Sequence, residues 1–124
     1  METPTQREVL EQLAEAGDEN LPTLLNTILL QHPAASPPEL LEQVAAAVES
    51  LERREYAVFS WYRGGWQRLT PAERAALSPL AGCVVWDATD GDWDWDSARL
   101  GDEWPVLTIT GAGRRRLRAP HHSG

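Results

Sequence analysis

The 124-residue sequence predicts an α+β fold in which three helices precede a small antiparallel sheet. Apolar residues recur at helical spacing through residues 1–55. After residue 55 the pattern changes to short runs of aromatic and β-branched residues, which is typical of strands. The length fits one domain, which we place at residues 1–118, followed by a polar tail at residues 119–124.

Three helices are expected before residue 56. The first begins at a capping box at residues 3–6 and ends near Gly17. The second begins after Asn20, a favourable N-cap, and ends at His32 because a residue before proline avoids the helical region. The third begins at another capping box, at residues 36–39. Its apolar stripe comprises Leu40, Leu41, Val44, Ala45, Val48 and Leu51.

Short strands follow the helices. Residues 56–63 are predicted to form a strand, and after the turn at Gly64 and Gly65, residues 66–69 are expected to pair back on it. A third capping box, at residues 70–73, predicts a short helix through about Leu77. Residues 83–86 and 105–110 are further strands, and residues 114–118 form a terminal helical turn after the breaks at Gly111 and Gly113. We expect residues 87–103 to form an acidic loop.

The charge composition narrows the classes of function. All 11 basic residues are Arg, and 19 acidic residues give a formal net charge of −8. A nucleic-acid-binding domain usually carries a net basic face, so this charge argues against that class while leaving room for a local basic patch. The single cysteine, Cys83, excludes an internal disulfide and favours a cytoplasmic setting. No secretory signal and no apolar run of membrane-spanning length is present.

The order of elements resembles the winged helix-turn-helix family. Two segments carry the resemblance: the exit from the third helix at residues 51–56, and residues 110–117, which resemble the phrase that closes the wing. The resemblance covers residues 5–118. It implies a three-helix core followed by a small antiparallel sheet, here with an enlarged wing that contains a short helix.

The third helix lacks the side chains that DNA reading requires. In winged-helix regulators this helix enters the major groove and needs Arg, Lys, Asn or Gln with basic neighbours. Here it offers Glu39 and Glu42, and no basic residue occurs between Pro37 and Leu51. Carboxylates are repelled by phosphates, so we expect Glu39 and Glu42 to belong to a protein-binding surface. The alternative is a DNA-binding transcriptional regulator that contacts DNA through Arg53, Arg54, Arg114, Arg115, Arg116 and Arg118.

Acidic residues and tryptophans alternate at residues 92–96. In an extended chain Asp92, Asp94 and Asp96 point one way, whereas Trp93 and Trp95 point the other way. Three interpretations stay open. The three Asp residues and Glu103 match the first, third, fifth and twelfth positions of an EF-hand-like calcium loop, although Ser97 replaces its required glycine. The Trp pair could instead anchor a protein partner, or it could cover the sheet while the Asp side faces solvent.

The other tryptophans are expected to be structural. Trp61 and Trp66 flank the Gly-Gly turn and are predicted to meet across strands, while Trp86 and Trp104 bracket the acidic loop. Cys83 is expected to be a buried small residue rather than a nucleophile. The histidines, His32, His121 and His122, lack partners at metal-site or triad spacing.

Taken together, the sequence predicts a non-enzymatic, acidic, winged-helix-like interaction module without a cofactor or metal. Its expected partner is a basic protein, which it serves as an adaptor, an inhibitor or an immunity-type protein, and a homodimer is compatible with this prediction. Electrostatic complementarity would drive the binding. The predicted partner-binding residues are Trp93, Trp95, Asp92, Asp94, Asp96, Glu39 and Glu42.

Overall fold

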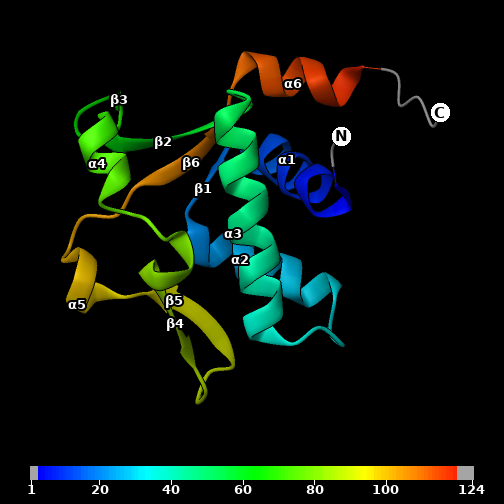
Figure 1. Ribbon diagram of the computed structural model, residues 1–124, viewed down its shortest axis with the longest axis vertical. Coiled ribbons are helices and arrows are strands. Elements are labelled where there is room, and N and C mark those ends of the chain that lie inside the picture. The colour runs from blue at the N-terminus through cyan, green and yellow to red at the C-terminus, as the bar shows by residue number, and fades with distance from the viewer. Residues whose placement is uncertain (1–2, 120–124) are drawn as a thin grey trace.

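Three helices form the N-terminal half of the fold (Figure 1). The computed structural model describes residues 3–119. Helix α1 spans Pro4–Ala16, α2 spans Leu21–Gln31 and α3 spans Pro37–Arg53. The core between them consists of fully buried aliphatic side chains, among them Leu10, Leu13, Leu24, Leu25, Val44 and Val48. The predicted apolar stripe of α3 lies within this core, because each of its six residues is buried.

Two of the three predicted caps before residue 40 are confirmed. The hydroxyl of Thr3 accepts from the Gln6 amide, and the side chain of Asn20 accepts from the Thr23 amide at 2.8 Å. The capping box at Ser36 is wrong, since its side chain makes no capping hydrogen bond. Helix α3 nevertheless begins at Pro37, because a proline at the first helical position already has a helical φ angle.

A four-stranded antiparallel sheet packs against the helices. Its strands are β1 (Asp18–Glu19), β2 (Ala57–Tyr62), β3 (Trp66–Arg68) and β6 (Val106–Ile109), arranged in the order β1-β6-β2-β3. The inner face buries Ala57, Phe59, Leu107 and Ile109. The sequence prediction missed β1, whose two residues are too short for a periodic pattern. The predicted α+β class, with helices first and strands after, is confirmed.

The chain between β3 and β6 holds several short elements rather than a long loop. Helix α4 (Pro71–Ala75) begins at the predicted capping box of Thr70 and Glu73. A 3-10 helix (Leu80–Cys83) then leads into the hairpin of β4 (Val84–Asp87) and β5 (Asp92–Trp95), which helix α5 (Ser97–Leu100) follows. The prediction of an irregular loop at residues 87–103 is therefore wrong. Strand β5 packs against α2, which supplies the tertiary support that the sequence pattern did not reveal.

Helix α6 (Gly111–Arg118) closes the described chain and begins earlier than predicted. Thr110 caps it by accepting from the Gly113 amide at 3.0 Å. Gly113 permits a close approach, because a Cβ atom there would lie 2.3 Å from the Tyr56 carbonyl oxygen. Arg7 of α1 donates to the Leu117 carbonyl, which holds α6 beside α1. Within residues 3–119 no helix is both long and apolar enough to cross a membrane. Residues 120–124 of the predicted polar tail lie outside the described residues.

Candidate functional site

The Trp pair of the β4–β5 hairpin is buried. Trp93 and Trp95 are only 6% and 4% exposed and belong to the hydrophobic core. Asn26 of α2 secures the strand: its amide nitrogen donates to the Trp93 carbonyl at 2.9 Å, and its amide oxygen accepts from the Trp93 N–H at 2.7 Å. The prediction that these indoles anchor a partner from an exposed position is therefore wrong. They cover α2, not the sheet, because the hairpin folds back across that helix.

The aspartates of the hairpin do not assemble the EF-hand-like set. Asp96 caps α5 by accepting from the Ala98 amide, and Asp94 accepts from the Trp95 amide at 2.8 Å. Glu103 binds Arg63 through both carboxylate oxygens, away from the aspartates. Among the described residues, the contacts of Asp94, Asp96 and Glu103 therefore do not support the calcium interpretation, which was one of the three left open.

A different acidic group gathers at the turn of the hairpin. The carboxylates of Asp87, Asp90 and Asp92 lie within 4.8 Å of one another. The negative charge of Asp87, with smaller effects from its hydrogen bond and from Asp92, raises the pKa of Asp90. The group is largely exposed and has no further feature that indicates a bound ion.

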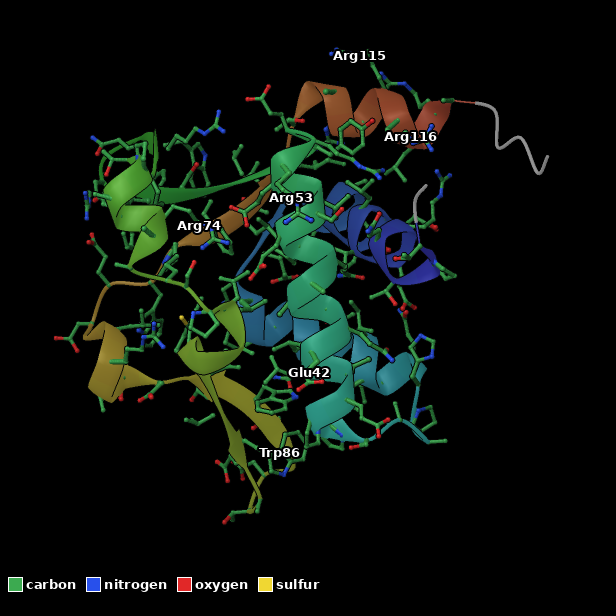
Figure 2. All side chains as sticks on the ribbon, viewed as in Figure 1. Glu42, Arg53, Arg74, Trp86, Arg115 and Arg116 are labelled. Carbon is green, nitrogen blue, oxygen red and sulfur yellow. The ribbon has the colours of Figure 1, made fainter. Side chains whose placement is uncertain are left out.

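Helix α3 exposes acidic residues, as predicted. Glu39 and Glu42 are both exposed, and Figure 2 shows Glu42 on the face of α3 that points away from the core. A second acidic surface, which the sequence analysis missed, lies beside this helix. A groove of about 410 Å³ runs between α1, the end of α2 and the start of α3. Glu8, Glu11 and Glu15 line its α1 side.

The composition of this groove is polar and negative. Amide side chains from all three helices, those of Gln12, Gln31 and Gln43, complete its polar lining. His32 also lines it, and its Nε2 lies 2.9 Å from each carboxylate oxygen of Glu8. We call this surface the acidic groove. Its signal was present in the sequence, because residues 8, 11 and 15 are spaced to share one helix face.

The predicted nucleic-acid residues come together at one end of the molecule. Thr110 donates from its backbone to the Tyr56 carbonyl and from its hydroxyl to the Glu55 carbonyl, so α6 begins beside the end of α3. Figure 2 shows Arg53 on α3 below Arg115 and Arg116 on α6. Arg53, Arg54, Arg114, Arg115 and Arg118 are exposed. The β4–β5 hairpin with its aspartates lies at the opposite end (Figure 1).

Arg74, which the sequence analysis did not single out, has a structural role. Its guanidinium binds Glu52 of α3 through two hydrogen bonds of 2.7 and 2.8 Å and lies 5.5 Å from the centre of the Phe59 ring. The hydrogen bond to Glu52 raises the pKa of Arg74. Arg99 also has a structural role, within the segment between β3 and β6. It donates to the carbonyls of Ala76, Ser78 and Gly82. The Arg74–Glu52 contact attaches the segment between β3 and β6 to helix α3, whereas the Arg99 contacts hold that segment together internally.

Cys83 and three of the remaining tryptophans make hydrogen bonds or ring contacts with nearby residues. The Cys83 thiol is buried and donates to the Leu77 carbonyl, and burial raises its pKa. Trp61 does not meet Trp66, contrary to prediction: it donates to Glu73 at 3.0 Å, whereas Trp66 contacts Tyr62. Trp86 packs edge-on against Trp93, with ring centres 5.2 Å apart.

The histidines give no indication of a catalytic site. His32 contacts Glu8, as described above, while His121 and His122 lie outside the described residues. No protein-family model matches the chain, and no curated protein or solved structure does so either. The features that indicate a function are the acidic groove, the acidic face of α3 and the basic end, which is formed by the arginines at the end of α3 and on α6.

Proposed function

We propose that this protein is a non-enzymatic, winged-helix-like module that binds a basic segment of a protein partner in the cytoplasm. The acidic groove carries this proposal. The position of β6 between β1 and β2, after three helices, supports the winged-helix part of the proposal. The single reduced thiol, Cys83, supports the cytoplasmic setting.

The charge distribution around the groove favours a cationic ligand. Three carboxylates from α1 face one space, and the described residues that line it include no arginine. Two of these carboxylates have partners, since Glu11 pairs with Arg7 at 3.4 Å and Glu8 contacts His32, so Glu15 is the most available of the three to a ligand. Two opposite charges 4 Å apart attract by about 1 kcal/mol in water and by about 4 kcal/mol near a protein surface. The amides of Gln12, Gln31 and Gln43 can accept further hydrogen bonds from a guanidinium, which carries five donors. An arginine-rich segment therefore fits this groove best.

The exposed face of α3 extends the negative surface. Glu39 and Glu42 lie on the same helix as Gln43, which lines the groove. The same residues disfavour docking of α3 in the major groove of DNA, since phosphates repel them. A basic partner that lies across the groove and α3 would thus contact carboxylates of both surfaces. Their attraction would increase its rate of association.

The test measures the affinity of an oligoarginine peptide for the protein at low salt. The double substitution Glu11→Gln with Glu15→Gln should weaken binding about tenfold, because each lost charge removes part of the attraction. The control Asp90→Asn with Asp102→Asn changes net charge equally but lies outside the groove, and should have little effect. Equal weakening by both double variants would show that net charge, not the groove, attracts the peptide.

A second candidate function is supported by the basic end. Residues 55 and 56, which follow Arg53 and Arg54 at the end of α3, bind Thr110 at the start of the Arg-rich α6. Arginines from both segments could therefore contact the phosphate backbone of a nucleic acid. A titration against random-sequence duplex DNA at low salt separates the two candidates. Binding that falls steeply with salt and that is weakened by Arg115→Gln with Arg118→Gln would favour this second function. Absence of binding by the folded protein would exclude it.

A further inference from the structure

Three large aromatic side chains are exposed on the outer face of the four-stranded sheet. Tyr62 is 67% exposed, Trp66 is 53% exposed and Trp104 is 44% exposed. Tyr62 lies directly opposite Trp66 in the β2–β3 pairing, and their rings meet edge to face at 5.1 Å. Directly paired residues point to the same face, so these two rings share the outer side of the sheet.

The register of β2 and β6 adds Trp104 to this group. The paired residues of β2 and β6 end at Ser60 and Val106, and Trp104 lies just before β6. Continuing the same register by two residues would bring Trp104 opposite Tyr62. The ion pair of Arg63 and Glu103, one position beyond Tyr62 and Trp104, follows the same register. Val58 and Val106, which alternate with the inward residues of their strands, are partly exposed on the same side. We call the surface formed by Val58, Tyr62, Trp66, Trp104 and Val106 the aromatic sheet face.

The charges around this face are few and opposite in sign. Asp18 of β1 pairs with Thr108 and so lies on the outer side at one edge of the sheet. Arg68 of β3 pairs with Ser60 and lies on the outer side at the other edge. Both are exposed, and Arg68 makes only a long contact of 3.9 Å with Glu55. With Glu55, the partner of Arg68, these edge charges sum to −1, whereas the whole chain carries −8.

We propose that the aromatic sheet face binds the same face of a second copy of this chain. Two chains of −8 repel each other across their acidic surfaces, and this face, which carries little net charge, reduces that repulsion. A two-fold axis along the strands places β1 of one copy over β3 of the other. Asp18 is level with Val58 and Arg68 with Ser60, so Asp18 and the Arg68 of the other copy lie two residues apart along the strands, about 7 Å, a gap that the long arginine side chain spans. Such an interface is self-complementary, as two-fold symmetry requires. Aromatic residues and arginine are also the residue types enriched in interfaces.

The size of the face indicates a weak dimer. Strands lie about 4.8 Å apart and rise about 3.4 Å per residue, so four short strands present a face of about 15 Å by 20 Å. That is below the roughly 800 Å² per partner of a standard stable interface. We therefore expect the dimer to form only at high protein concentration. It does not rest on the proposed function, because the acidic groove lies between helices and not on this face.

The first test follows the sedimentation coefficient of the full chain over a concentration series. The wild-type protein should shift from monomer to dimer, and Trp66→Thr should raise the dimer dissociation constant by about tenfold or more. Leu30→Gln is the matched control, because Leu30 is an exposed apolar residue of α2, outside the sheet. A wild-type chain that stays monomeric over the whole series would overturn the proposal. So would an equal weakening by Leu30→Gln.

The second test reverses the two charges and identifies the occupant as a second copy. Asp18→Arg and Arg68→Glu should each weaken the homodimer, because each brings like charges together. An equimolar mixture of the two variants should recover dimer, since in the mixed pair both contacts again join opposite charges. Circular dichroism confirms that each variant is folded. A mixture that remains as monomeric as the separate variants would contradict the two-fold arrangement.

Discussion

Two groups of aromatic residues occupy short strands of this protein, and they have opposite surroundings. In the β4–β5 hairpin Trp93 and Trp95 face α2 and are almost fully buried. In the main sheet Tyr62, Trp66 and Trp104 are exposed. Trp93 and Trp95 alternate with aspartates, yet this alternation only specifies two faces of the strand and does not say which face is covered. Whether a tryptophan is core or surface depends on the layer that packs behind its strand.

The largest expected effect on the free energy of unfolding comes from substituting a buried tryptophan. Trp95→Ala should lower the free energy of unfolding by about 3–5 kcal/mol, because it removes a large buried ring and leaves a cavity. Urea denaturation followed by far-ultraviolet circular dichroism measures this loss. A change below about 1 kcal/mol, the range of surface substitutions, would contradict the burial of Trp95.

Trp95→Phe is the matched variant for that experiment. Among residues 3–119, the buried indole N–H of Trp95 has no hydrogen-bond partner, so a phenyl ring loses no hydrogen bond to them. It also relieves the cost of a buried unsatisfied donor, about 1–3 kcal/mol, which offsets part of the lost volume. We therefore expect Trp95→Phe to be much milder than Trp95→Ala in the same urea titration.

An intermediate effect is expected where the hairpin meets α2. Asn26→Ala removes two hydrogen bonds to the Trp93 backbone and should cost about 1–3 kcal/mol of unfolding free energy, since partly buried groups lose their partners. Asn26→Asp keeps the acceptor but loses the donor, and should also destabilise the protein. Gln31→Ala, an exposed change on the same helix, serves as the control. Comparable losses in Asn26→Ala and Gln31→Ala would show that the hairpin does not depend on Asn26.

The smallest expected effect on stability comes from substituting an exposed aromatic residue of the main sheet. At concentrations where the chain is monomeric, Trp66→Thr should cost less than about 1 kcal/mol of unfolding free energy, because it removes only the cross-strand contact with Tyr62 at a half-exposed position, and threonine suits a strand. Thermal denaturation in dilute solution checks this. A loss as large as that of Trp95→Ala would remove the distinction between the two aromatic groups.

Local signals predicted much of the secondary structure. The caps at Thr3, Asn20 and Thr70 were read correctly, because an N-cap hydrogen bond joins residues only three positions apart. Ser36 shows the limit of such a signal, since its box is present in sequence and its side chain does not cap. The two-residue strand β1 was missed because its support comes from β6, at the other end of the chain.

The candidate site was predicted only in part. Glu39 and Glu42 are exposed on α3 as expected, since helical periodicity separates them from the buried stripe. The interpretation of Trp93 and Trp95 as exposed anchors was wrong. Their burial depends on a contact with Asn26, which is 67 residues away in the chain and leaves no signal near residue 93. The acidic groove was missed, although its three α1 carboxylates follow helical spacing, because its walls come from three helices.

The sequence by itself determined the helices, the α+β order and the partition of charge, with acid on α3 and base after residue 113. These properties depend on composition and on contacts between residues close in the chain. Only the tertiary structure decided which tryptophans are core, that three helices line an acidic groove, and that α6 begins beside the end of α3. The physical reason is that burial and electrostatic fields depend on distances in space, which are set by packing between distant segments.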